Sequence, residues 1–135
     1  MKALVLSNGE LKEKEINNTL EELQKIVGGY IEFPFLGKKF KDNVIDVIVN
    51  EEGKFIDGLK PEIAIINEKA GNILDIVYGN CIFTSHDKEG NTIALNDEQI
   101  KIVMEELETV VELMHKDSLE NFEVRALFIW VLKIG

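Results

Sequence analysis

Cys81, His86 and His115 are the residues of this chain whose side chains could perform nucleophilic or acid–base chemistry. Cys81 is the only cysteine, and no histidine stands at the spacing of a zinc site. His86 lies in the run Thr-Ser-His-Asp, but neighbouring residues of a strand point to opposite faces, and catalytic triads form by convergence in space. We therefore interpret Cys81 as a buried apolar residue and 84–87 as an exposed turn. The sequence predicts no catalytic residue, no metal site and no cofactor.

A second kind of chemistry is the capture of an anion. Arg125 is the only arginine among the 15 basic residues, and it lies in the most apolar segment of the chain. An unpaired charge there is costly, so Arg125 must find a partner. For an anionic small molecule, we expect several copies of Arg125 in an oligomer to bind it, while Lys38, Lys39 and Lys41 screen its phosphates. The alternatives are that Arg125 faces solvent or pairs with a nearby glutamate, and that the lysines form a solvated loop guarding an edge strand.

An acidic stripe is the third candidate. Glu105, Glu108 and Glu112 follow the spacing of one face of a helix. Such a stripe is usually a solvated face. The alternative is a DNA-mimic surface, in which spaced carboxylates imitate phosphates and inhibit an enzyme that binds nucleic acid.

Composition limits the possible partners. The 135 residues carry a formal net charge of −10, with 45% hydrophobic and 30% charged residues. An acidic chain repels nucleic-acid backbones and anionic membranes, so we expect no direct contact with either. No apolar run reaches the length of a membrane span. With one cysteine no internal disulfide can form, which favours a cytoplasmic location.

Local patterns predict a β-hairpin and then a helix at the N-terminus. The Asn-Gly turn at 8–9 joins a strand over 2–6 to one over 11–16. Thr19 and Glu22 fit a capping box. Gly28 and Gly29 end the helix, and Gly29 is expected to need a positive φ.

The middle of the chain reads as short strands and turns. A second helix is expected to begin at Asn96, with Gln99 at the capping-box position and an apolar stripe from Ile100 to Met114. Together these patterns predict an α+β fold, with a mainly antiparallel sheet and two principal helices packed on one face. Strands are expected over 30–35, 44–49, 54–56, 73–78, 81–85 and 92–95, with a basic loop over 37–43 and a helical turn over 61–66.

The C-terminal segment 117–135 is the most apolar part of the chain. We predict a strand over 124–132, which must be a central strand, a buried helix or an oligomer contact. We therefore expect a homo-oligomer, most simply a dimer, that uses part of 122–134. The chain is predicted to be one domain, 1–135, with a core over 1–116.

Several segments resemble a known family when taken in order. The most specific are Val-Gly-Gly-Tyr-Ile-Glu at 27–32 and Asn-Glu-Glu-Gly-Lys at 50–54, supported by segments at 1–6, 75–79 and 95–100. Over roughly residues 1–105 they resemble the bacterial and phage family catalogued as domain of unknown function 3846. After Pro61 this chain has Glu62 and Ile63 where the family pattern has Asn and Ala. The resemblance implies a small cytosolic protein of mobile elements, with no known activity and no catalytic residues to carry over. Tyr30 and Glu32, in the most specific segment, are candidate partner contacts.

Three functions remain open at this stage. The first is a non-enzymatic binding protein of phage type that acts against host defence by stoichiometric binding of a host defence protein or of its nucleotide-derived signal. The second is the DNA mimic, and the third is an enzyme whose site is scattered in the sequence.

Overall fold

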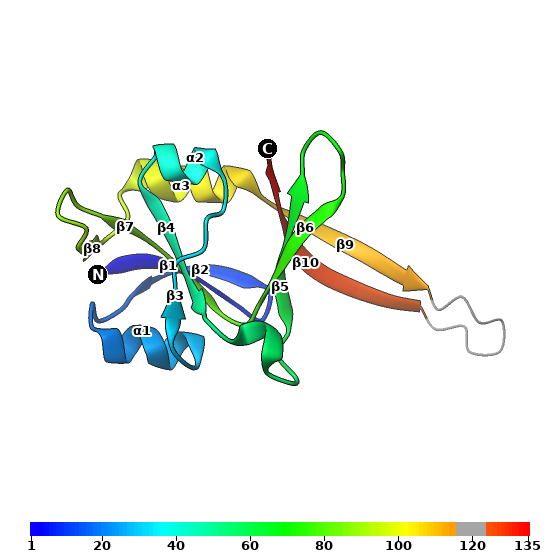
Figure 1. Cartoon of the computed structure of the whole chain (residues 1–135), viewed down its shortest axis with the longest axis horizontal. Helices are drawn as coiled ribbons and strands as arrows, with labels where there is room; N and C mark the ends of the chain where they lie inside the picture. Colours follow the sequence, from blue (N-terminus) through cyan, green and yellow to red (C-terminus); the bar gives the residue numbers. More distant parts are fainter. Residues whose placement is uncertain (116–123) are drawn as a thin grey trace.

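The fold is built from two β-sheets that lie face to face (Figure 1). The computed structural model describes the backbone of residues 1–115 and 124–135 and the side chains of 1–108 and 129–135. The first sheet has the order β2-β1-β7-β4-β3, with β8 also paired to β7, and the second has the order β6-β5-β10-β9. Every strand pair is antiparallel except β5 with β10. The predicted α+β class with a mainly antiparallel sheet is confirmed.

The strands and helices have the following bounds. The first sheet contains β1 (Lys2–Ser7), β2 (Glu10–Glu15), β3 (Ile31–Glu32), β4 (Ile45–Asn50), β7 (Cys81–His86) and β8 (Thr92–Ile93). The second contains β5 (Pro61–Asn67), β6 (Ile73–Tyr78), β9 (Leu107–His115) and β10 (Val124–Ile134). The helices are α1 (Leu20–Val27), α2 (Lys38–Asp42), α3 (Asp97–Glu106) and the short 3-10 helix η1 (Gly53–Phe55).

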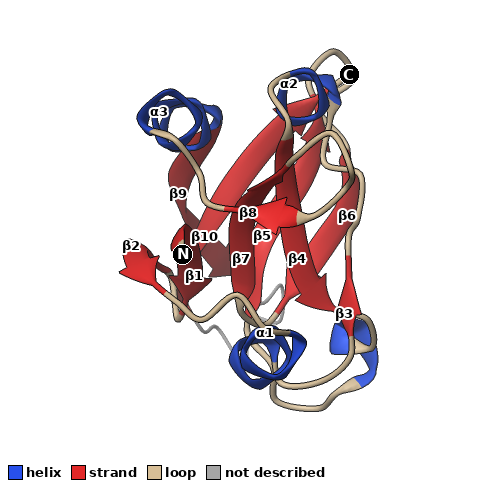
Figure 2. Cartoon of the chain, turned by 90° about the vertical axis from the view of Figure 1, so that its left-hand side faces the viewer, coloured by secondary structure: helices blue, strands red, loops and turns tan. Residues whose placement is uncertain are grey.

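The two longer helices cover opposite faces of the first sheet, which corrects the expectation that they share one face (Figure 2). Alternate residues of a strand point to opposite faces, so β1 feeds two separate cores. Leu4 lies in the larger core between the sheets, where α3 contributes Val103. Val5 lies in the smaller core on the other face, where α1 contributes Leu23. Burial of both faces makes β1 a continuous apolar run rather than an alternating one.

Helix α1 begins and ends as predicted, but the special glycine is Gly28. The Thr19 side chain accepts a hydrogen bond from the Glu22 N–H, and Gly28 adopts the left-handed conformation at φ 83°. Gly29 has an ordinary φ, so the expectation of a positive φ there is wrong. A side chain at Gly29 is disfavoured for a different reason, because a Cβ there would lie 3.0 Å from the side-chain amide of Asn50.

Helix α3 is shorter than its apolar stripe predicted. The capping box of Asn96 and Gln99 is present, but the helix ends at Glu106 and residues 107–115 form β9. The change follows from pairing, since β9 lies against β10 over its whole length, from Leu107 opposite Leu132 to His115 opposite Val124. β-Branched residues at 109–111 suit a strand better than a helix.

Three shorter segments also differ from expectation. Residues 61–66 belong to β5, an inner strand of the second sheet, and not to a helical turn. The basic segment 37–43 forms the short helix α2 instead of a loop. Of the expected strand 30–35, only Ile31 and Glu32 pair with β4, and 54–56 overlaps η1.

The expected C-terminal strand is confirmed as β10, and it is central. It pairs with β5 on one side and β9 on the other. Leu132 is buried in the inter-sheet core, and Trp130 packs against that core. Packing within the chain therefore accounts for much of the apolar character of 129–134. The expected oligomer contact over 122–134 stays a prediction, and residues 116–123 lie outside the described part of the chain.

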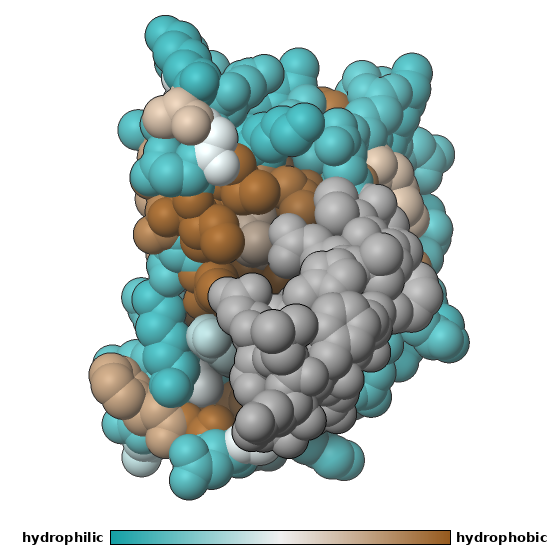
Figure 3. Space-filling view, turned by 90° about the vertical axis from the view of Figure 1, so that its right-hand side faces the viewer, coloured by the Kyte–Doolittle hydropathy of each residue, from teal (hydrophilic) through white to brown (hydrophobic). Residues whose placement is uncertain are grey.

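The outer face of the second sheet is apolar (Figure 3). Register places Ala64 opposite Ile76 on one side and Val131 on the other, so these side chains share the face turned away from the first sheet. At the edge of this sheet, Ile73 and Leu74 are exposed. Ala64 and Val131 are themselves buried, so the exposed apolar area lies at the edge, at Ile73 and Leu74.

A clamp joins the tip of the first hairpin to the second sheet. The Gly9 N–H donates to Glu62 Oε2 at 2.9 Å, and Trp130 Nε1 donates to the Gly9 carbonyl oxygen at 2.9 Å. Glu62 is only 2% exposed and lies where the register of β5 against β6 shifts between Pro61 and Ile63. A β-bulge of this kind redirects a side chain, which here lets a carboxylate reach the hairpin from an inner strand.

Candidate functional site

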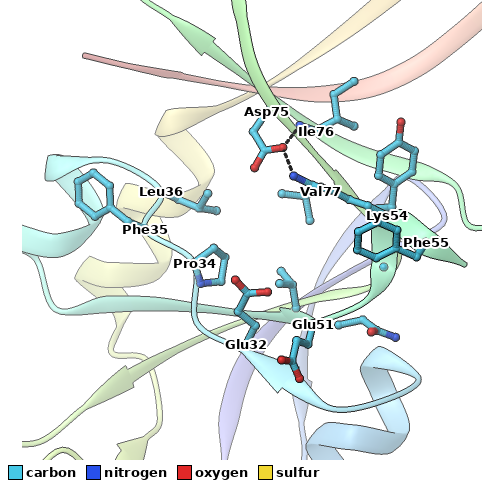
Figure 4. A pocket seen from close by; sticks show the side chains of 14 residues that line it. Glu32, Pro34, Phe35, Leu36, Glu51, Lys54, Phe55, Asp75, Ile76 and Val77 are labelled. Carbon is cyan, nitrogen blue, oxygen red and sulfur yellow. Dashed lines mark hydrogen bonds and ion pairs between the residues drawn. The ribbon is translucent and has the colours of Figure 1, made fainter.

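A groove of about 320 Å³ separates the edges of the two sheets (Figure 4). Strands β3 and β4 form one side, and β6 with η1 forms the other. Its apolar lining includes Leu36, Val49 and Val77, which are themselves buried. We call this feature the inter-sheet groove.

Aromatic side chains stand around the inter-sheet groove. Phe35 is 65% exposed and Phe55 is 84% exposed, and both line the groove. Pro34 has no N–H to donate to a ladder, and strand pairing ends at Glu32, so the following residues leave the sheet. Large apolar side chains held in water are the feature expected of a binding surface.

Phe55 owes its position to a close approach of η1 to β6. A Cβ on Gly53 would lie 2.9 Å from the Tyr78 carbonyl oxygen, which only glycine avoids. The chain therefore turns tightly at Gly53 and presents Phe55 across the groove from Phe35 (Figure 4).

The charged side chains of the groove are mainly acidic. Glu32, Glu51 and Asp75 line it together with one base, Lys54. Lys54 Nζ binds Asp75 Oδ1, and this hydrogen bond is the main reason that the pKa of Lys54 is raised. Within the part of the chain whose side chains are described, Glu32 and Glu51 form no ion pair.

Two further hollows adjoin the inter-sheet groove. Tyr30, which is 71% exposed, lines one together with Ile56, and this hollow shares Asn50 with the groove. Phe33 lines the other, which shares Phe35 with the groove. The three hollows thus form one continuous surface along the edge of β4.

The hollow beside Phe33 also holds a histidine–carboxylate pair. His86 Nδ1 lies 2.8 Å from Asp46 Oδ2. Ser85 does not join this pair, because its hydroxyl donates to the Val44 carbonyl oxygen at 2.7 Å and accepts from Gln99. The run 84–87 therefore forms no triad, as the strand alternation predicted, although Ser85 is buried and not part of an exposed turn.

The thiol of Cys81 is fully buried. Burial raises its pKa to about 12, and the Glu62 carboxylate adds to this effect. The prediction that Cys81 packs as an apolar residue is confirmed. Among the described residues, no group of three or more His, Cys, Asp and Glu side chains is placed to hold a metal ion.

The predicted anion-binding residues lie on two elements, the three lysines on α2 and Arg125 on β10. Lys38 and Lys39 line a hollow beside the C-terminus, and Lys38 forms an ion pair with Asp42. Lys41 lines the hollow near Phe33. Arg125 lies near the distal end of the β9–β10 hairpin, opposite Met114, and its side chain is outside the described part (Figure 1). Anion capture by several copies of Arg125 stays a prediction.

The predicted helical stripe of glutamates is wrong. Glu105 lies on α3, but Glu108 and Glu112 lie on β9, so the three do not share one helix face. Glu108 also pairs with Lys133 at 3.5 Å. The regular carboxylate spacing that suggested a DNA mimic is therefore not formed.

Tyr30 and Glu32 are the predicted site residues that the structure brings together. Both lie on the surface described above, and Lys41 lines its third hollow, beside Phe33. Sequence reasoning missed Phe35, Phe55 and Asp75. The signal for the first two was present, namely phenylalanines on both sides of Pro34 and another after Gly53, in polar or glycine-rich surroundings.

Comparison with known proteins gives one match. A family model described as a domain of unknown function, DUF3846, matches residues 1–108. This range includes every residue of the inter-sheet groove. No curated protein and no solved structure matches the chain. In the described residues, no helix is long and apolar enough to cross a membrane.

Proposed function

We propose that this chain, which belongs to the DUF3846 family, is a non-enzymatic binding protein that binds a host protein in its inter-sheet groove. The observation that carries the proposal is the exposure of Phe35 and Phe55 on the two sides of one groove. Aromatic side chains are the commonest anchors of protein interfaces, and leaving them in water is unfavourable unless a partner covers them.

Charge favours a protein over a nucleotide as the ligand. Three carboxylates and one amine line the groove, so a phosphate entering it meets net repulsion. The lysines that could offset this charge lie in other hollows. We therefore prefer a protein partner to a nucleotide-like signal.

The proposed setting is the cytoplasm of a bacterial host, in which a phage or mobile element uses the protein against host defence. Small phage-borne proteins often act by stoichiometric binding, and the family resemblance is the basis for this part of the proposal. The DNA mimic is the weaker alternative, since the net charge remains but the glutamate stripe does not.

Quantitative affinity capture from host lysate tests the proposal. Phe35→Ser and Phe55→Ser should each reduce recovery of a co-purifying protein at least tenfold, because each removes an aromatic ring that the bound partner would bury. Met104→Ser is the matched control, since Met104 is 44% exposed on α3, away from the groove. Equal recovery with all three variants would contradict the proposal, and so would a partner that is chemically altered at substoichiometric amounts of this protein.

A further inference from the structure

The charges of the inter-sheet groove specify more than a generic apolar partner. Asp75 is already neutralised by Lys54, because its carboxylate accepts a hydrogen bond from the Lys54 ammonium. Glu32 and Glu51 remain, and among described side chains neither has a cation within ion-pair distance. In Figure 4, Glu32 points toward the open space between Pro34 and Val77. Lys54 also attracts Glu32, since that carboxylate contributes to the raised pKa of Lys54, but three carboxylates against one ammonium leave the groove with a net negative charge beside an apolar floor.

The walls of the groove suit one kind of cation. Leu36, Val49 and Val77 form an apolar floor that can cover the aliphatic stem of a long basic side chain. The exposed ring of Phe55 at the rim can receive the face of a guanidinium. A guanidinium also donates two parallel hydrogen bonds to a carboxylate, which an ammonium cannot do. These features together favour arginine over lysine.

The surroundings of the groove suit an extended segment. Strand β6 is the edge strand of the second sheet, and β3 pairs with β4 only as far as Glu32. The groove thus runs between two sheet edges. On this strand the Ile76 N–H donates to Asp75 Oδ1 at 2.8 Å. Because this N–H is already bonded, it is not free to pair with an added strand. Side-chain recognition must therefore supply the specificity.

We infer that the inter-sheet groove binds an extended, arginine-bearing segment of the partner protein, with the guanidinium held by Glu32 above the apolar floor and with Glu51 adding negative charge beside the groove. This inference rests on the proposed function and adds the chemistry of the partner. It follows from charge complementarity, since a neutral or acidic segment would leave both carboxylates desolvated and unpaired.

Fluorescence anisotropy with short labelled peptides tests the inference. The probe alternates arginine with leucine, and three matched peptides replace arginine by lysine, by the neutral isostere citrulline or by glutamate. We expect the arginine peptide to bind the native protein most tightly, the lysine peptide several-fold more weakly, and the other two at least about tenfold more weakly. Binding should weaken as salt is raised, because the carboxylates lie at the mouth of an open groove.

A charge-matched pair of variants separates the groove from the overall charge. Glu32→Gln with Glu51→Gln should weaken the arginine peptide about tenfold or more. Glu89→Gln with Glu98→Gln removes the same formal charge from exposed positions elsewhere and should change binding less than twofold. Circular dichroism checks that both double variants keep the native fold.

Each outcome decides the inference. Equal weakening by the two double variants, equal affinity for the citrulline peptide, or no binding of the arginine peptide to the native protein would overturn it. If Phe35→Ser abolishes partner capture while the Glu32 and Glu51 double variant captures normally, the proposed function stands and this inference fails. If capture is insensitive to Phe35→Ser and Phe55→Ser, the proposed function itself fails.

Discussion

Replacing Glu62 by alanine is expected to destabilise the protein strongly, although no binding residue is touched. Glu62 is a carboxylate on an inner strand, 2% exposed, and it accepts the Gly9 N–H at 2.9 Å. Together with Trp130 it fixes the tip of the first hairpin to the second sheet. Alanine removes the acceptor and leaves a cavity. Glutamine keeps an acceptor of the same shape and removes only the charge.

The magnitude follows from the loss of one partner of a buried hydrogen bond. Such a loss costs about 1–3 kcal/mol, and the missing side-chain packing adds to it. Removal of a buried charge offsets part of this cost. We therefore expect Glu62→Ala to lower the free energy of unfolding by about 2–3 kcal/mol, which corresponds to a decrease in Tm of roughly 6–12 °C for a chain of this size. For Glu62→Gln we expect a change within about 1 kcal/mol.

Urea unfolding followed by tryptophan fluorescence measures these changes. Trp130 is the only tryptophan and contacts Gly9, so its emission reports on the clamp directly. Glu68→Ala, at an exposed position just after the same strand, is the control and should change stability by less than about 0.5 kcal/mol. A loss below that value for Glu62→Ala would refute the clamp. Equal losses for alanine and glutamine would show that the charge, and not the acceptor, is needed.

The other predictions concern the interior, one turn and assembly. Cys81 should not react with a thiol reagent at neutral pH until the protein unfolds, because burial raises its pKa to about 12 and excludes the reagent; rapid labelling of the native protein would contradict its placement. Gly28→Val should lower the free energy of unfolding by about 1–3 kcal/mol in thermal or urea melts, since φ is 83°, whereas an unchanged melt would place the strain elsewhere. Homo-oligomerisation using part of 122–134 is expected to give a dimer by light scattering at high micromolar concentration. A monomer at that concentration would contradict the prediction.

Local signals in the sequence predicted the N-terminal hairpin and α1 well. The Asn-Gly turn, the N-cap at Thr19 and the glycine at 28 act within a few residues, so the hairpin and α1 follow from them. The end of α3 could not be predicted in this way. The apolar residues after Glu106 continue the helical stripe although those at 109–111 are β-branched, and what decides for a strand is β10, a partner distant in the chain.

The candidate site shows the same limit. Tyr30 and Glu32 were predicted from one continuous segment. The rest of the groove forms because the edges of two sheets come together, which places Phe35, Phe55 and Asp75 around one space. No spacing in the sequence encodes that convergence. The anion site stays a prediction, since Lys38, Lys39 and Lys41 lie on α2, Arg125 lies on β10, and the expected capture needs several copies of the chain.

Site-specific photo-crosslinking tests most directly whether a partner protein occupies the inter-sheet groove. A photoreactive phenylalanine analogue would replace Phe35, Phe55 or, as the control on α3, Met104, in protein produced inside the host. The account predicts that the analogue at Phe35 and at Phe55 cross-links to the same host protein, near an arginine of that protein, and that the analogue at Met104 does not. Cross-linking of that protein as strongly from Met104, or from neither groove position, would contradict the account.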